Sequence, residues 1–194
     1  MRSIQMKFKT LYPQSFPKHL PIKSLVCFFL IFLTGVITPF PKIPKQERVP
    51  LVFEITEHYG RFVPTLLSFA YPIFKKDPVG LIQIIHVSIA TTIATHSLKW
   101  ALNSVSLFDR RLGQRPNGGN KNMPSGHSSM IFCALGFLVC RYGALWLWFL
   151  PLAFLTMGAR IYYNAHTIGA LLAGLAVGVI CALLLSSPKE KSKF

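Results

Sequence analysis

Six apolar segments, separated by charged or turn-forming residues, constrain this chain more than any other feature. They lie at about 25–40, 62–74, 79–98, 128–139, 144–159 and 167–186. Several are shorter than the ~20 residues that a perpendicular membrane helix needs, and Pro64 and Pro72 interrupt the second. With 52% hydrophobic and 14% charged residues, the chain has more apolar surface than a soluble domain of this length buries. We therefore expect an all-α integral membrane protein, a bundle of six transmembrane helices with short loops.

The first apolar segment follows a basic stretch, an arrangement that it shares with secretory signal peptides. It ends at residues 38–41, Thr-Pro-Phe-Pro, rather than at a cleavage site of small residues, which favours a retained first helix. The chain then divides into a basic cytoplasmic tail at 1–24, a membrane domain at 25–187 and a second basic cytoplasmic tail at 188–194.

Loop charge predicts the orientation of these helices. Lys and Arg are enriched in cytoplasmic loops, and they occur in both tails, at Lys75 and Lys76, and at Arg141. These segments alternate with the other loops, so we expect both termini in the cytoplasm. The protein would then be a multi-pass component of a bacterial inner membrane, with the remaining loops facing the periplasm.

One of the periplasmic loops, between the third and fourth segments, breaks this charge trend. It carries five cations, Lys99, Arg110, Arg111, Arg115 and Lys121. Cations on the translocated side oppose insertion, so we expect them to bind an anion. A formal net charge of +15 would suggest nucleic acid for a soluble protein. Beside six apolar segments, the expected partners are instead membrane lipids and a lipid phosphate substrate, with neither nucleic acid nor an obligate protein partner.

Three short motifs carry the candidate chemistry, and the expected topology places all three at one membrane surface. They are Arg115-Pro116 preceded by Lys99, Pro124-Ser125-Gly126-His127, and Arg160 followed by His166. The second motif leads directly into an apolar segment, and the exposed N–H groups at a helix start bind anions. Ser125 can cap that helix or donate to a phosphate oxygen, Gly126 allows close approach, and His127 can protonate a leaving oxygen.

The spacing of the third motif predicts a break in the helix. Six residues turn an α-helix through about 600°, so Arg160 and His166 would not share a face of one continuous helix. A break near residues 162–164 would let both side chains reach one ligand.

Together these motifs resemble the three signature motifs of the type-2 phosphatidic acid phosphatase superfamily. The resemblance implies a six-helix membrane phosphatase that uses no metal and no cofactor. It also implies that His166 attacks phosphorus to give a phosphohistidine and that His127 is the general acid. The phosphate oxygens would be held by Lys99, Arg115, Ser125, Gly126 and Arg160.

Over most of its length the chain is also similar to the lipid A 1-phosphatases of Helicobacter and its relatives. The similarity lies in the runs at 41–45, 56–59, 111–116 and 118–120. It implies removal of the 1-phosphate of lipid A at the outer leaflet of the inner membrane, which lowers surface negative charge and favours resistance to cationic antimicrobial peptides. The motifs also fit a phosphatase or phosphotransferase acting on phosphatidylglycerol phosphate, phosphatidic acid or undecaprenyl diphosphate. A transporter or scaffold for anionic lipid is the non-enzymatic alternative.

The chain departs from the superfamily pattern at two positions. Phe108 stands where the family has a Lys seven residues before the motif Arg, so either Lys99 fills that role across an insertion of about nine residues, or Arg110 or Arg111 does. Ala170 stands where an Asp would orient the nucleophilic histidine. Asp109 or a backbone carbonyl is then the candidate for that task, and Arg110, Arg111 and Lys121 are further candidates for contact with the substrate.

Overall fold

The computed structural model describes residues 49–189 together with Leu33. The helices are α3 (Leu51–Ile55), the π-helix η1 (Thr56–Gly60), α4 (Phe62–Phe74), α5 (Pro78–Ala101), α6 (Gly126–Tyr142), the 3-10 helix η2 (Ala144–Phe149), α7 (Leu150–Tyr162) and α8 (Ile168–Leu185). Strands β1 (Ser106–Leu107) and β2 (Arg110–Arg111) form a two-residue antiparallel hairpin. The described fold is therefore mostly helical, and this hairpin is its departure from the expected all-α structure. The predicted span at 25–40 and the tail at 1–24 lie outside the described residues.

Three helices of the described region are long and apolar enough to cross a membrane. They are Pro78–Ala101, Ala144–Tyr162, which joins η2 to α7, and Ile168–Leu185. Helices α4 and α6 coincide with two more predicted spans but have 13 and 17 residues. Pro72 lies inside α4, which continues to Phe74. The membrane character of the chain is confirmed, while the count of six spans stays a prediction.

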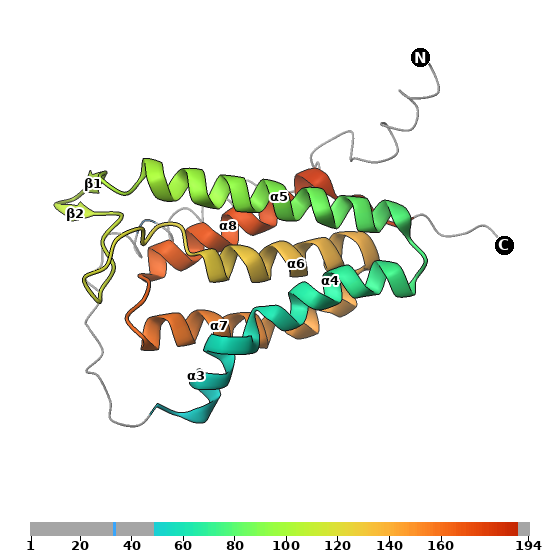
Figure 1. Ribbon diagram of the computed structural model, residues 1–194, viewed down its shortest axis with the longest axis horizontal. Coiled ribbons are helices and arrows are strands. Elements are labelled where there is room, and N and C mark those ends of the chain that lie inside the picture. Colours follow the sequence, from blue (N-terminus) through green and yellow to red (C-terminus); the bar gives the residue numbers. More distant parts are fainter. Residues whose placement is uncertain (1–32, 34–48, 190–194) are drawn as a thin grey trace, which may run out of the picture.

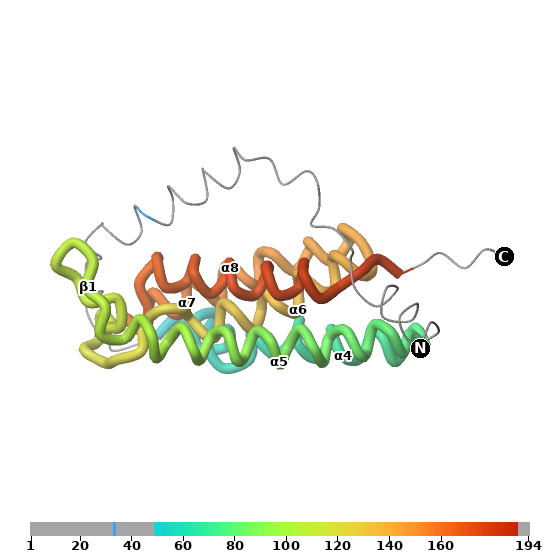
Figure 2. The backbone as a smooth tube through the Cα atoms, turned by 90° about the horizontal axis from the view of Figure 1, so that it is seen from above, coloured from blue at the N-terminus to red at the C-terminus, as the bar shows by residue number. Residues whose placement is uncertain are grey.

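Consecutive helices from α4 to α8 run roughly antiparallel along one long axis, and α8 lies beside both α5 and α6 (Figures 1 and 2). Small residues let α6 and α8 approach closely, as is common between membrane helices. A Cβ at Gly178 would lie 2.5 Å from the carbonyl oxygen of Ser129, and one at Gly174 would meet that of Ser125. The core beside this contact combines α6, α7 and α8 through Ile131, Phe132, Leu135, Ala153, Met157 and Leu171.

The motif residues and the predicted cytoplasmic cations lie at opposite ends of the helices. The end of α5, the hairpin, the start of α6, the end of α7 and the start of α8 meet at one end of the molecule (Figure 1). At the opposite end, the Lys189 side chain donates to the carbonyl oxygen of Lys75, and the Lys189 N–H donates to that of Arg141. The three sequence motifs therefore share one end, as the expected topology predicted.

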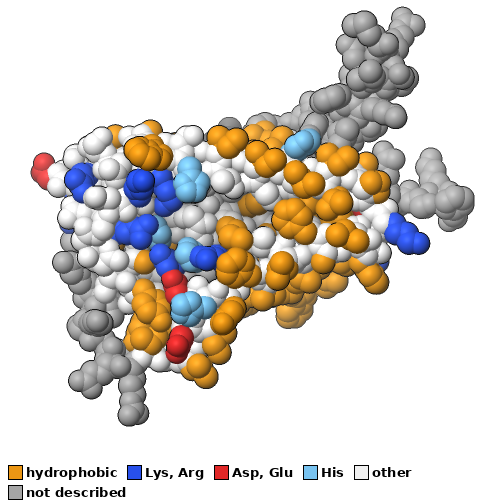
Figure 3. Space-filling model, viewed as in Figure 1, with side chains coloured by type: hydrophobic (Ala, Val, Ile, Leu, Met, Phe, Trp, Pro, Cys, Tyr) orange, Lys and Arg blue, Asp and Glu red, His pale blue; other side chains and the backbone are white. Residues whose placement is uncertain are grey.

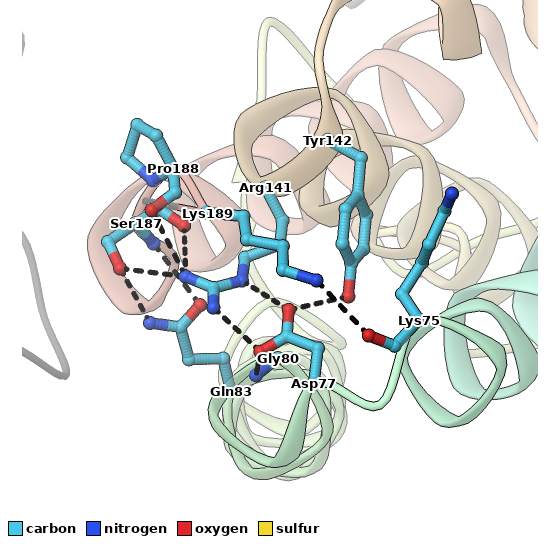
Figure 4. A network of polar contacts seen from close by, with 9 residues as sticks. All are labelled: Lys75, Asp77, Gly80, Gln83, Arg141, Tyr142, Ser187, Pro188 and Lys189. Carbon is cyan, nitrogen blue, oxygen red and sulfur yellow. Dashed lines mark hydrogen bonds and ion pairs between the residues drawn. The ribbon is translucent and has the colours of Figure 1, made fainter. Parts of the chain in front are cut away.

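A buried ion pair, which the sequence analysis did not identify, joins α5 and α6 at that opposite end (Figure 4). Asp77 caps α5 by accepting from the Gly80 N–H, and its carboxylate accepts two hydrogen bonds from Arg141, at 2.9 and 2.8 Å. Arg141 also donates to the carbonyl oxygens of Ser187 and Pro188. Asp77 and Arg141 are only 6% and 7% exposed. Arg141, read from the sequence as a loop cation, is thus a buried group that holds three parts of the chain together.

The pKa of Asp77 reflects these contacts. Burial of the carboxyl group opposes its ionisation. The hydrogen bonds from Arg141, the Gly80 N–H and Tyr142 outweigh that effect and lower the pKa from 3.8 to about 2. Asp77 is therefore a carboxylate at neutral pH, and Arg141 does not lie buried without a counter-ion.

Candidate active site

The predicted break between Arg160 and His166 is present. Helix α7 ends at Tyr162 and α8 begins at Ile168, with Asn164 in the left-handed region at φ 51°. The N–H of Ala165 donates to the carbonyl oxygen of Arg160 at 2.9 Å, which closes the turn. This turn buries His166, which is 2% exposed, close to the end of α7 that carries Arg160.

The second motif begins α6 as expected and is fixed against α8. Ser125 is the N-cap of α6, and its Oγ accepts from the Ser128 N–H at 3.5 Å. The Ser125 N–H donates to the carbonyl oxygen of Ala170 at 2.8 Å. Because Ala170 lies on the first turn of α8, this bond joins the start of α6 to the helix that follows His166. Gly126 and His127 are thereby held beside the nucleophile predicted from sequence.

Three of the predicted cations surround both histidines. Lys99 lies in the last turn of α5, is buried, and donates to the carbonyl oxygen of Lys121 at 3.0 Å. The loop that carries Arg115 is tied to the turn between α7 and α8 through the Asn117 N–H, which donates to the Asn164 carbonyl oxygen. The positive charges of Lys99, Arg115 and Arg160 act on His127 and on His166 alike. The structure thus brings the predicted residues of the three motifs together.

Two of these cations retain hydrogen-bonding capacity inside the site. The Nε atoms of Arg115 and Arg160 are buried and have no hydrogen-bond partner among the described residues. Buried donors in folded proteins are nearly always paired. An anion with several oxygen atoms would satisfy both guanidinium groups, as phosphate commonly does.

Glu57 and Arg61 also reach the site, and the sequence analysis did not identify them as site residues. Glu57, on η1, forms an ion pair with Arg160, while its Oε1 lies 4.0 Å from Nε2 of His127. Arg61 donates to the same Nε2 atom. The carboxylate of Glu57 therefore pairs with Arg160 and lies close to His127. In the sequence, Glu57 stood out only as part of the run at 56–59, which supported the resemblance to the lipid A 1-phosphatases and not a role in the site.

Figure 3 shows how this chemistry is distributed over one face of the molecule. The cationic side chains, the histidines and acidic groups gather mainly toward the end that carries the hairpin. Hydrophobic side chains cover most of the remainder of that face. The charged site therefore lies where the apolar surface stops, as expected for an enzyme whose substrate has a phosphate at the membrane surface.

His166 is held neutral by its surroundings. Burial lowers its pKa first, and the charges of Arg160, Lys99 and Arg115 lower it further, from 6.5 to about 2. One ring nitrogen therefore carries a lone pair at neutral pH. Its Nδ1 atom lies 3.2 Å from Oδ1 of Asn122. Asn122 is the residue that the structure places against this ring, through its side chain and through a backbone hydrogen bond, whereas Asp109 lies in the turn of the hairpin.

The depressed pKa of His166 predicts a loss of stability in mild acid. Below pH 6.5 the unfolded chain binds a proton at His166 that the native protein does not bind, so stability falls as the pH falls. At pH 5 this difference costs about 2 kcal/mol, at 1.36 kcal/mol for each pH unit. Chemical unfolding in detergent at pH 7 and pH 5 should show that the His166→Gln variant loses less stability than the unsubstituted protein. Equal losses for the two proteins would contradict the prediction.

The additional candidates from the same loop lie around the site rather than within it. Arg110 and Arg111 are exposed on β2, and Asp109 lies in the turn of the hairpin. These three residues line a cavity of about 290 Å³ together with Arg115, Asn122 and Thr167. Lys121 stacks over the ring of Trp100 at 4.2 Å. The segment expected to be an insertion contains this small hairpin, and the charge of Lys99, unlike those of Arg110 and Arg111, is among those that lower the pKa of both histidines.

The chain is similar to several known proteins. The model of the PAP2 superfamily matches residues 80–192. A lipid A 1-phosphatase of Helicobacter pylori strain 26695 is 53% identical over 184 residues, which cover 94% of this chain and 97% of the relative. The lipid A 1-phosphatase of strain J99 is 53% identical, with 94% and 96% covered. A lipid A 4'-phosphatase of strain J99 is 31% identical over 153 residues, with 76% and 75% covered. No solved structure gives a significant match.

Proposed function

The chain belongs to the PAP2 superfamily, and on this premise we propose that it is a lipid A 1-phosphatase. The similarity to two such enzymes over nearly the whole chain supports the substrate. The observation that carries the chemistry is the neutral, buried imidazole of His166 within the field of Lys99, Arg115 and Arg160. A nucleophile with a lone pair and dense positive charge around it are what phosphoryl transfer requires.

The reaction begins when Nε2 of His166 attacks the phosphorus of the 1-phosphate. The bond between phosphorus and the sugar oxygen breaks, and His127 gives its proton to that leaving oxygen. Lys99, Arg115 and Arg160 stabilise the negative charge on the equatorial oxygens, together with Ser125 and the N–H groups at the start of α6. The products of this step are the dephosphorylated lipid and a phosphohistidine.

Water completes the cycle. It attacks the phosphohistidine while His127, now neutral, takes its proton, and inorganic phosphate leaves with His166 regenerated. Arg61 donates to Nε2 of His127, so this atom carries a lone pair in the structure. The negative charge of an arriving phosphate offsets the surrounding cations and favours the protonated His127 that the first step needs.

The hairpin supplies the remaining contacts in this proposal. Arg110, Arg111 and Asp109 border the cavity beside Arg115, where the sugar headgroup would lie when the phosphate is on the cations. Lys99 fills the role of the family Lys, because it is buried at the site while both arginines are exposed. The active-site end would face the periplasm of a bacterial inner membrane, with both termini in the cytoplasm. Removal of the phosphate there would lower surface negative charge and favour resistance to cationic antimicrobial peptides.

The same residues would serve a phosphatase or phosphotransferase for another lipid phosphate, so the substrate needs a direct test. Purified protein should release phosphate from lipid A in preference to phosphatidic acid, phosphatidylglycerol phosphate and undecaprenyl diphosphate. Mass spectrometry of lipid A from cells with and without the gene should show one phosphate fewer when the gene is present. An unchanged phosphate count would sink the lipid A assignment.

The mechanism predicts that a chelator does not inhibit the enzyme. Lys99, Arg115 and Arg160 supply the charge stabilisation that a divalent ion provides in other phosphatases. Activity of the purified protein in EDTA should equal that in buffer, and added Mg²⁺ should not raise it. Loss of activity in EDTA, followed by recovery with one divalent metal, would contradict the mechanism.

A further inference from the structure

A buried amide lies against the predicted nucleophile. Asn122 is 2% exposed and is held in place by its backbone N–H, which donates to the carbonyl oxygen of Gly113 at 2.9 Å. Its Oδ1 lies 3.2 Å from Nδ1 of His166 and accepts from the Thr167 N–H at 3.2 Å. Its Nδ2 donates to Oγ1 of Thr167 at 3.0 Å.

This network fixes which atom of Asn122 faces the histidine. A backbone N–H can only donate, so the atom that meets the Thr167 N–H must be the amide oxygen. The same oxygen meets Nδ1 of His166, which must therefore carry the hydrogen. Because the imidazole is neutral, its lone pair is then on Nε2.

On these contacts, and on the basis of the function proposed above, we infer that Asn122 is the positioning residue for His166. It holds the ring in the Nδ1–H tautomer, so that Nε2 attacks and the intermediate is an Nε2-phosphohistidine. In the attack, Nε2 gains the bond to phosphorus, the leaving oxygen departs with the proton from His127, and Nδ1 keeps its hydrogen in the bond to Asn122.

Position 170, one helical turn after His166, does not offer this help. Ala170 is fully buried and packs against Met123, with Leu102 and Leu112 beside them. Its carbonyl oxygen is already used by the Ser125 N–H. An acceptor for Nδ1 must therefore come from another part of the chain, and the loop before α6 delivers one.

An amide and a carboxylate differ in what they do for this ring. Asn122 accepts the Nδ1–H bond but adds no charge, so it fixes the tautomer and leaves His166 only weakly basic. A carboxylate at the same place would also accept the bond, and its negative charge would raise the pKa of His166. Asn122→Asp and Asn122→Leu therefore test the side-chain acceptor, because leucine has a similar size and no polar side-chain atom, while the backbone hydrogen bond of residue 122 to His166 is kept in both.

The test measures kcat, KM and the phosphohistidine isomer. Asn122→Leu should lower kcat by at least about 100-fold, as loss of a tautomer-fixing partner does in other enzymes, while KM changes little because the cations still hold the phosphate. Asn122→Asp should keep kcat within about tenfold. On acidification it should lose activity at a higher pH than the unsubstituted enzyme does, because the carboxylate makes His166 easier to protonate. Asn120, an exposed amide in the same loop, gives the control Asn120→Leu, which should keep kcat.

Trapping of the phosphohistidine during turnover identifies the attacking nitrogen, and the protein is kept in base because the phosphohistidine is labile in acid. Protein denatured in base should carry the Nε2 isomer in the unsubstituted enzyme and in Asn122→Asp. An Nδ1-phosphohistidine, or full kcat in Asn122→Leu, would overturn the role of Asn122 without touching the phosphatase assignment. If no lipid phosphate is cleaved and no phosphohistidine forms in the unsubstituted protein, the proposed function itself fails.

One measurement needs no substitution of Asn122, so it does not depend on whether the Asn122 variants fold. The ¹⁵N resonances of histidine-labelled protein, assigned by comparison with His166→Gln, should show a protonated Nδ1 and an unprotonated Nε2 for His166 at pH 7. The reverse tautomer would refute the inference.

Discussion

The His166→Gln variant is expected to release no measurable phosphate, a loss of at least about 10⁴-fold in kcat, because no group remains to accept the phosphoryl group. Glutamine is close in size and keeps a polar atom near Asn122, so the buried turn between α7 and α8 should still fold. Phosphate release from lipid A by purified protein measures the effect, and unchanged binding to detergent-solubilised substrate checks the fold. Turnover at the unsubstituted rate would refute the assigned nucleophile.

His127→Gln should differ from that variant in a way that separates the two roles. With lipid A the loss should be about 10²- to 10⁴-fold, the usual contribution of a general acid. With p-nitrophenyl phosphate, whose leaving group needs no proton, the variant should phosphorylate His166 as fast as the unsubstituted enzyme does. Hydrolysis of the phosphohistidine should stay slow, because this step still needs His127 as a base. The expected result is a burst of nitrophenol equal to one turnover. A linear time course at full rate, or no burst and no product, would contradict the role of His127.

The sequence predicted those features that have a local cause. Helix α4 occupies the apolar segment at 62–74 and α6 begins one residue after its Ser125 cap, because apolar runs and capping residues act over a few positions. The break after Arg160 followed from helical phase alone. The hairpin did not, since its turn consists of Phe108 and Asp109, both at positive φ, instead of the usual Asn-Gly or Asp-Gly.

The side-chain partners from distant segments were not predictable in this way. Glu57 meets Arg160 across 103 residues, Asn122 meets His166 across 44, and Asp77 meets Arg141 across 64. Hydrophobic periodicity indicates which face of a helix is buried, but it does not say which polar groups of two helices lie at the same height. Each of these pairs depends on how the helices are stacked, which only the packed structure determines.

The largest expected effect on stability comes from the pair at the end of the molecule opposite the active site. Asp77→Leu leaves the guanidinium of Arg141 buried without its counter-ion, and such a change costs about 3–5 kcal/mol. Unfolding in detergent by a denaturant series should show this loss in the free energy of unfolding. Asp77→Asn should cost less, since the amide still accepts one hydrogen bond from Arg141 and occupies the same space.

A double substitution tests whether the cost is that of an unpaired charge. Asp77→Leu combined with Arg141→Leu removes both ions, so the double variant should be more stable than Asp77→Leu alone. Any protein that remains folded should hydrolyse lipid A at the unsubstituted rate, because Lys99, Arg115 and the two histidines of the proposed mechanism lie at the other end of the helices. A double variant as unstable as the sum of the single variants would mean that Asp77 and Arg141 act separately, against the contacts seen between them.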